Sequence, residues 1–153
     1  MTPDIVIRLA RPDDFDAWKP LWDGYNEFYG RVGPTALPDA ITMTTWARFH
    51  DDAEPMHALV AERGDELLGI VHFLCHRSTI LEAPTCYLQD LFTSQSSRGL
   101  GVGRALIEEV TRAARARGSA RVYWLTHETN TQAMLLYDKV ADKSGFIVYR
   151  KAV

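Results

Sequence analysis

A glycine-rich turn between a strand-like run and a helix-like run is the feature that most constrains how this chain folds. The turn reads Arg98-Gly99-Leu100-Gly101-Val102-Gly103-Arg104 and separates residues 86–92 from residues 105–117. Glycine accepts positive φ and lets the backbone approach a ligand closely. The helix that follows points free N–H groups and the positive end of its dipole into the turn. Since phosphate binds at such places, the sequence predicts a site for a phosphorylated ligand.

Two common phosphate-binding fingerprints do not fit this turn. A dinucleotide fingerprint, G-x-G-x-x-G, would need glycine at Arg104 or at Leu106. A P-loop that starts at Gly99 would need Gly-Lys where the chain has Arg104-Ala105. The pattern that remains is Arg-x-x-Gly-x-Gly, which residues 98–103 satisfy.

The order of the expected elements indicates an α/β protein with a mixed sheet. Antiparallel hairpins combine with a βαβ crossover, and the 153 residues suit one domain, 1–153. We expect about six strands and four helices in a strongly twisted sheet. The strands are predicted at residues 5–9, 57–62, 66–75, 85–92, 122–126 and 146–149, and the helices at 14–28, 39–49, 105–117 and 129–142. The first helix has Asp13 as its expected N-cap, and Pro20 predicts a kink or a short first turn within it.

Composition argues against several functional classes. A net charge of −3 argues against a general nucleic-acid binder. No apolar run approaches the ~20 residues of a membrane span, and the N-terminus lacks the regions of a signal peptide. We therefore expect a cytoplasmic protein with no membrane partner. Cys75 and Cys86 are expected to be reduced, although they could lie on neighbouring strands.

The Arg-x-x-Gly-x-Gly pattern at 98–103 resembles the acyl-CoA-binding motif of the GNAT N-acetyltransferase superfamily. A second block, N-x-x-A-x-x-x-Y from Asn130 to Tyr137 with Gly-Phe at 145–146, resembles the helix and strand that close the CoA site in that family. The resemblance implies the GNAT-type acyl-CoA N-acyltransferase fold and an N-acetyltransferase that uses acetyl-CoA. Residues 87–92, 124–130 and 136–139 look most like the Hpa2-like branch, whose members acetylate primary amines.

The resemblance also implies which residues bind the donor. The strand before the turn would splay from the next parallel strand, so that the pantetheine arm pairs with its backbone. The turn amides would hold the pyrophosphate, and the arginines would add charge-assisted bonds. A plain tight turn and a solvated helix face are the alternatives for these glycines and arginines. The donor-binding residues would be Leu91, Phe92, Thr93, Arg98, Gly99, Leu100, Gly101, Val102, Gly103, Arg104, Asn130 and Tyr137.

Direct attack of an amine on a thioester needs a base and an acid. The ammonium must lose a proton to gain a lone pair, and the leaving thiolate must be protonated or stabilised. The resemblance assigns the acid to Tyr137, whose phenol roughly matches a thiolate in pKa; the alternative is a packed aromatic. Asp90 is the best carboxylate, acting through water or by attracting the cationic amine; the alternative is a buried salt-bridge partner. Related enzymes often have Glu before this Asp, whereas Gln89 cannot act as a base.

The acceptor pocket has no diagnostic pattern. Aromatic residues of the first helix could shape it, although such a stripe also suits a core. The substrate-binding candidates are Tyr25, Glu27, Tyr29, Asp90, His127 and Glu128. His72 and His76 alternate along one strand with the same facing, but no third ligand has suitable spacing, so we expect a structural role for both and no metal.

We expect the acceptor to be a small primary amine such as a polyamine, an amino acid or an aminoglycoside. A protein lysine or N-terminal acceptor and a non-catalytic acyl-CoA sensor are the alternatives. The spacing from Tyr137 to residues 145–146 exceeds the common family spacing and suggests an extra turn in the last helix. The chain stops at Val153, just after the expected closing strand, which would leave an unpaired edge. A homodimer that covers this edge is therefore expected.

Overall fold

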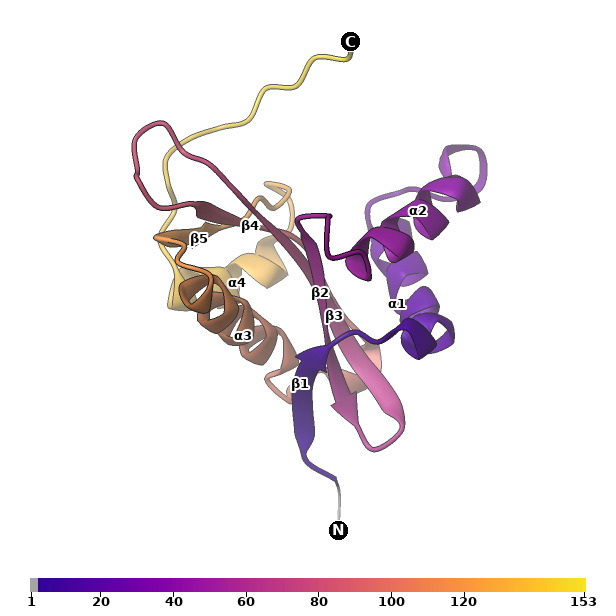
Figure 1. Cartoon of the computed structure of the whole chain (residues 1–153). Helices are drawn as coiled ribbons and strands as arrows, with labels where there is room; N and C mark the ends of the chain where they lie inside the picture. Colours follow the sequence, from indigo (N-terminus) through magenta and orange to yellow (C-terminus); the bar gives the residue numbers. More distant parts are fainter. Residues whose placement is uncertain (1–2) are drawn as a thin grey trace.

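The computed structural model describes residues 3–153, with a five-stranded mixed sheet between two layers of helices (Figure 1). Sheet order follows chain order: β1 to β4 are antiparallel, and β5 pairs parallel to β4. The expected mixed α/β fold is confirmed. The strands are β1 (Ile5–Leu9), β2 (Met56–Arg63), β3 (Glu66–His76), β4 (Thr85–Thr93) and β5 (Arg121–Tyr123).

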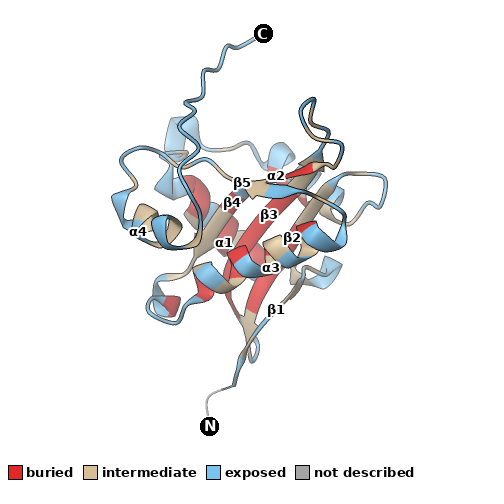
Figure 2. Cartoon of the chain, turned by 90° about the vertical axis from the view of Figure 1, so that its left-hand side faces the viewer, coloured by how far each residue is buried: buried red, intermediate tan, exposed pale blue. Residues whose placement is uncertain are grey.

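Helices cover both faces of the sheet. They are α1 (Phe15–Phe28), α2 (Asp39–Phe49), α3 (Val102–Ala116) and α4 (Thr131–Val140). Helices α1 and α2 lie on one face, where Trp18, Trp22 and Trp46 pack against Ile70. Helices α3 and α4 lie on the other, where the side chains of α3 bury Phe73 and its neighbours. Burial is concentrated in the central strands and the inward helix faces (Figure 2).

A β-bulge interrupts β4 near its middle. Phe73 of β3 pairs with Leu88, and the preceding His72 pairs with Asp90, so Gln89 is an extra residue on β4. A bulge bends the strand that carries it and increases its twist. The parallel ladder between β4 and β5 is confined to the three pairs before this point. The rest of β4 therefore has an open edge on that side.

The expected closing strand at residues 146–149 is not formed, so there are five strands in residues 3–153 rather than about six. These four residues are between 64% and 88% exposed, and the chain after α4 runs away from the sheet (Figure 1). A segment with high β propensity becomes a strand only beside an edge that accepts its hydrogen bonds. The extra turn expected for the last helix is also absent, because α4 ends at Val140.

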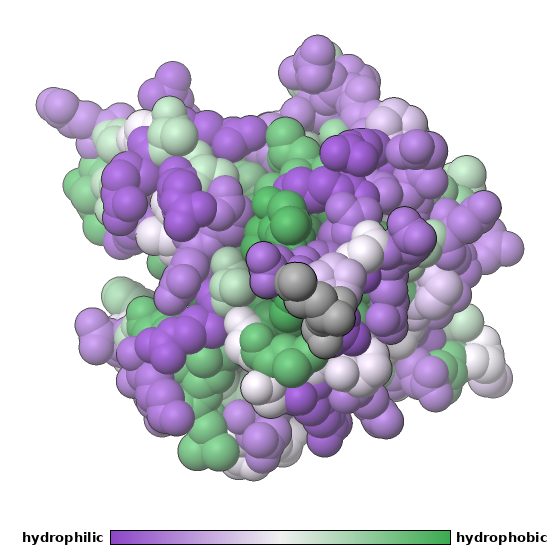
Figure 3. Space-filling view, turned by 90° about the horizontal axis from the view of Figure 1, so that it is seen from below, coloured by the Kyte–Doolittle hydropathy of each residue, from purple (hydrophilic) through white to green (hydrophobic). Residues whose placement is uncertain are grey.

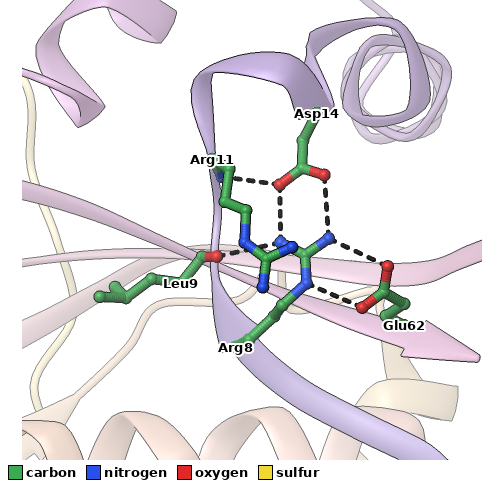
Figure 4. A network of polar contacts seen from close by, with 5 residues as sticks. All are labelled: Arg8, Leu9, Arg11, Asp14 and Glu62. Atoms are coloured by element: carbon green, nitrogen blue, oxygen red, sulfur yellow. Dashed lines mark hydrogen bonds and ion pairs between the residues drawn. The ribbon is translucent and has the colours of Figure 1, made fainter.

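Arg8 fastens the edge strand β1 to its surroundings (Figure 4). Its Nη1 and Nη2 lie 2.7 and 2.9 Å from the carboxylate oxygens of Asp14. Its Nε and Nη2 lie 2.8 and 3.1 Å from those of Glu62 on β2. Asp14 also accepts the backbone N–H of Arg11 at 2.6 Å. The network joins β1, β2 and the turn before α1.

The β1 edge carries exposed apolar side chains. Val6 and Leu9 are 53% and 57% exposed, and hydrophobic groups near the start of the chain lie within a largely hydrophilic surface when the molecule is seen from below (Figure 3). No helix within residues 3–153 combines the length and apolarity needed to cross a bilayer.

Cys75 and Cys86 face each other on β3 and β4, and both thiols are free. Burial and the neighbouring Cys75 raise the pKa of the Cys86 thiol to about 12. The thiol of Cys86 is therefore held in its unreactive protonated form.

Candidate active site

The glycine turn lies between the end of β4 and the start of α3. Gly99 and Gly101 have φ of 78° and 74°, in the left-handed region. A Cβ built on either would meet no heavy atom within 4 Å. Backbone conformation, rather than crowding, therefore requires glycine at these two positions. Gly103 is different, because it lies inside α3 and its Cβ would contact Leu136 at an ordinary 3.5 Å.

Most amides of the turn are free to receive an anion. The N–H groups of Arg98 and Leu100 are already used, donating to the carbonyls of Gln95 at 3.2 Å and Ser97 at 3.1 Å. Within residues 3–153, no backbone acceptor takes the N–H groups of residues 99 and 101–104. The last three of these open α3, where the helix dipole favours negative charge. Arg104 adds positive charge there, and its side chain is 52% exposed.

The open edge of β4 continues from the bulge to this turn. Leu91, Phe92 and Thr93 are half-buried and lie beyond the last pair with β5. Leu91 packs toward the α3 layer, and Phe92 packs toward the α1 layer. Backbone groups on an unpaired strand edge can accept an extended ligand as an added strand. The arrangement therefore places a strand-like binding edge directly before an anion-binding turn.

The two other residues expected at the donor lie just before α4 and within it. Asn130 donates from Nδ2 to Oγ1 of Thr126 at 3.2 Å and does not cap the helix with its side chain. Tyr137 packs edge to face on Trp124. Burial, and next the phenol of Tyr29, raise the pKa of Tyr137 to about 12. Tyr137 is therefore protonated at neutral pH and can donate a proton.

A pocket of about 780 Å³ lies between α1, α2 and the middle of β3 and β4. Among the residues expected at the acceptor, Tyr25, Tyr29, Asp90 and His127 line it, whereas Glu27 and Glu128 are not part of its lining. Trp22, one of the aromatic residues of the first helix expected to shape the pocket, lines it as well. Arg31, Phe49 and His72 also line it and were not assigned to the acceptor from sequence. The helical spacing of Trp22 and Tyr25 was visible in the sequence, but the contact of their helix with β3 was not.

The bulge brings Asp90 into this pocket. Strand side chains alternate between faces, so an uninterrupted β4 would place position 90 with Leu88, against α3. The extra residue instead places Asp90 opposite His72, on the α1 face. Its side chain is 12% exposed. Burial, followed by the charge of Asp90 and a hydrogen bond to it, raises the pKa of Tyr25.

A cation shares the pocket with this carboxylate. The guanidinium of Arg31 lies 5.6 Å from the ring centres of both Tyr25 and Tyr29. Its Nε donates to Oδ1 of Asn26 at 2.6 Å. Arg150 lines the same pocket, and a pocket with one carboxylate and two guanidiniums can receive a ligand that carries both signs of charge.

The two histidines of β3 have different surroundings. His72 is buried beside Asp90, whereas Nε2 of His76 lies 2.7 Å from the hydroxyl of Tyr123 near the surface. In the part of the chain that the structure describes, no three side chains of His, Cys, Asp or Glu gather as a metal site would require.

The site combines three features: a strand edge left open beside the parallel pair of β4 and β5, a turn with free amides, and the half-buried Tyr137. Together they are typical of an acetyl-CoA-dependent N-acyltransferase. The chain belongs to the acetyltransferase (GNAT) family, whose family model matches residues 18–141. Acetyl-CoA is the usual donor in this family. The resemblance read from the glycine turn is therefore confirmed.

One curated relative matches nearly the whole chain. It is the D-amino-acid N-acetyltransferase HPA3 of Saccharomyces cerevisiae, 36% identical over 150 residues, which cover 96% of this chain and 90% of the relative. Two solved structures show the same fold. AAC(6')-Iy in complex with a CoA bisubstrate analog has 18% identity and a TM-score of 0.79, covering 98% of this chain and 99% of that one. A transcriptional regulator from Bacillus halodurans C-125 has 17% identity and a TM-score of 0.82, covering 98% and 100%.

Proposed function

We propose that this protein, as one domain of residues 1–153, transfers the acetyl group of acetyl-CoA to the primary amine of a small molecule. The observation that carries the proposal is the position of Asp90, a nearly buried carboxylate in a 780 Å³ pocket next to the open edge of β4. The edge and the turn at 99–104 would hold the donor, and the pocket would hold the acceptor. Both substrates would then be bound together, as direct transfer requires.

The donor would be held largely by backbone. Residues 91–93 would pair with the pantetheine arm, and the free N–H groups of residues 99 and 101–104 would bind the pyrophosphate. Arg98 and Arg104 would add charge from outside the turn. Asn130, whose amide is held by Thr126, would contribute a further polar group on the α4 side. The N–H groups of Arg98 and Leu100 are used within the turn. In this scheme Arg98 contacts the donor through its side chain, and Leu100 contributes only its place between the free amides.

The transfer would occur by direct displacement, with a named acceptor for each proton that is released. Asp90 attracts the ammonium form of the acceptor and takes one proton from it, directly or through water. The neutral amine attacks the thioester carbon, and the C–S bond breaks as the C–N bond is completed. Tyr137 donates its phenolic proton to the departing sulfur, and the proton released from the new amide nitrogen returns to solvent or to the phenolate. A proton donor in place at the leaving group contributes about 10²- to 10⁴-fold to such a step.

Within the class of small amines, the pocket favours amino acids. Asp90 suits an ammonium group, and Arg31 suits a carboxylate. A polyamine has no partner for Arg31, and its second cation would be repelled by the guanidinium. The relative named as a D-amino-acid N-acetyltransferase supports the same choice.

A screen for acetyl-CoA consumption tests the proposal. D- and L-amino acids, their amides, polyamines and lysine peptides would be compared, with CoA affinity measured separately by calorimetry. We expect turnover of amino acids, with KM raised at least about tenfold for the amides because they lack the carboxylate. The Arg31→Gln variant should lose this preference. Preferred turnover of lysine peptides would favour a protein acceptor, and CoA binding without turnover of any amine would favour a sensor.

We also propose that the protein acts as a homodimer in the cytoplasm. Three large apolar side chains are exposed in the single chain: Phe146 by 88%, Ile147 by 76% and Tyr149 by 88%. A second copy that covers them would remove this apolar surface from water. Val148 and Arg150 of the same segment reach the lining of the acceptor pocket. The facing but free thiols of Cys75 and Cys86 suit a reducing compartment.

A further inference from the structure

A chain of polar groups lies beneath the acceptor pocket, in the aromatic layer between α1 and the sheet. Indole Nε1 of Trp18 lies 3.0 Å from Nε2 of His72, and Nδ1 of His72 lies 2.9 Å from Oδ2 of Asp90. Trp18 is fully buried and His72 is 3% exposed. The three residues come from α1, β3 and β4, so the chain of hydrogen bonds runs from the helix layer along the α1 face of the sheet to the pocket.

Elementary donor and acceptor rules fix the proton on His72. An indole N–H can only donate, so Nε2 of His72 must accept and cannot carry a hydrogen. The ring proton is then on Nδ1, where it donates to the Asp90 carboxylate. An imidazolium would direct a second N–H at the indole N–H, with no acceptor between them. His72 is therefore a neutral imidazole with its hydrogen on Nδ1.

The surrounding side chains hold the imidazole in place. The ring centre of His72 lies 4.5 Å from that of Phe49 on α2 and 5.3 Å from that of Trp22 on α1. The titratable and charged groups that line the pocket with the His72–Asp90 pair are Tyr25, Tyr29, Arg31, Tyr87, His127 and Arg150. Buried polar groups whose hydrogen bonds are all satisfied are rigid. The Asp90 carboxylate at the end of this chain is therefore held in a fixed orientation.

We propose that Trp18 and His72 are positioning residues that present Asp90 to the acceptor amine by holding its Oδ2. This role rests on the proposed function. The pair carries a single negative charge, because the imidazole is neutral and Trp18 blocks its second nitrogen. His72 therefore does not store the proton that leaves the ammonium, which must stay on Asp90 or pass to water. The histidine fixes the direction of the carboxylate, and the tryptophan fixes the histidine.

Nitrogen-15 NMR of the imidazole rings tests the proton assignment without any substrate. In the whole protein, we expect His72 to show a protonated Nδ1 and an unprotonated Nε2. The Trp18→Phe variant keeps an aromatic ring, although a smaller one, and removes the indole N–H, so a hydrogen on Nε2 of His72 should become detectable. An imidazolium, or a hydrogen on Nε2, in the unmodified protein would overturn the proposal. This readout holds whether or not the protein acetylates amines.

Paired substitutions test the positioning role. His72→Asn keeps an N–H donor the same number of bonds from Cβ as Nδ1, whereas His72→Leu removes it. We expect kcat/KM for the amine to fall about 10- to 100-fold in His72→Leu and to stay within about threefold in His72→Asn, with the Kd for acetyl-CoA unchanged in both. His76→Asn, on the same strand but bonded to Tyr123, is the matched control.

Equal losses in both His72 variants would assign the residue to packing alone and overturn the proposal. Should His72→Leu fail to fold, Trp18→Phe replaces it in the kinetic comparison, and a ring-proton signature unchanged from the unmodified protein would then count against the role of the indole. A protein that binds no acetyl-CoA but shows the expected His72 signature would contradict the proposed function and leave the tautomer assignment standing.

Discussion

Tyr137 of α4 meets Trp124 edge to face, with ring centres 5.5 Å apart and planes inclined at 65°. Trp124 follows β5 directly, so this contact ties α4 to the end of the parallel strand. The phenol oxygen is not needed for it. A phenylalanine at position 137 would keep the packing and remove only the hydroxyl, which separates the two roles expected of this residue.

Tyr137→Phe is predicted to lower kcat at least about 10²-fold, because the leaving sulfur loses its proton donor. The melting temperature and the calorimetric Kd for acetyl-CoA should remain close to those of the unmodified protein. A parallel loss of affinity and rate would show that the hydroxyl binds the donor rather than protonating it.

The raised pKa of Tyr137 also predicts how stability changes in alkali. The folded protein holds the phenolic proton up to about pH 12, whereas a phenol has an ordinary pKa of 10.0. The unfolded chain therefore loses the proton first, so the stabilisation is complete below about pH 10 and declines as the pH rises toward 12. Thermal melts across this range should fall less steeply in Tyr137→Phe. Tyr25, whose pKa is also raised by burial, should leave part of the decline in place.

Alanine substitutions distinguish the glycines of the turn. Gly101→Ala forces a side chain into the left-handed region at φ 74° and should cost about 1–2 kcal/mol of unfolding free energy. Gly103→Ala stays helical with an ordinary contact to Leu136, so its stability should be kept or slightly raised. Chemical denaturation measures both effects. A weaker Kd for acetyl-CoA in the stable Gly103→Ala variant would place the ligand against that amide, and an unchanged Kd would exclude close approach there.

The Arg8 network is predicted to support the fold and not the reaction. Arg8→Met should lower the unfolding free energy by about 2 kcal/mol, because Asp14 loses its charged partner in a half-buried setting. The hydrogen bond from Arg8 lowers the pKa of Asp14, so the stabilisation is present above the ordinary value near 3.8 and is lost as the pH falls through the lowered one. The variant should therefore be less stable, and its stability should change less between neutral and acid pH. KM for both substrates should stay the same. A change in KM would connect β1 to the pocket.

The C-terminal segment is predicted to hold the dimer together. Light scattering at micromolar concentration should give twice the mass of the 153-residue chain, and the double variant Phe146→Asp, Tyr149→Asp should give the monomer. Ile80, which is 77% exposed in the β3–β4 loop, provides the control, because Ile80→Asp should remain dimeric. A monomer in the unmodified protein would contradict the proposal.

Local patterns predicted the elements whose formation depends on neighbours in the chain. The turn at 98–104 and the helix after it were predictable because glycine conformation and amphipathic spacing are local. The strand at 146–149 was not predictable in this way. Its β-branched and aromatic residues give it a high β propensity, but a strand also needs an available sheet edge to pair with. Whether such an edge is within reach depends on where β5 ends and where α4 directs the chain.

The site shows the same division. Asp90 and Tyr137 were singled out from sequence, and the structure places them on β4 and α4. The link between His72 and Asp90 was not visible, because 18 residues and a change of register separate them. Gln89 was noticed only as a residue that cannot act as a base. Nothing in its side chain signals that it is the unpaired residue of the ladder.

Removal of that unpaired residue would change the course of β4 rather than the face on which the carboxylate lies. Deletion of Gln89 would join Asp90 directly to Leu88, and regular alternation would still place its side chain opposite His72, on the α1 face. The shortened strand would instead lose the bend and the added twist of the bulge, at the point where the ladder with β5 stops. A chain without this position is therefore expected to keep its carboxylate in place and to narrow the gap between its two parallel strands.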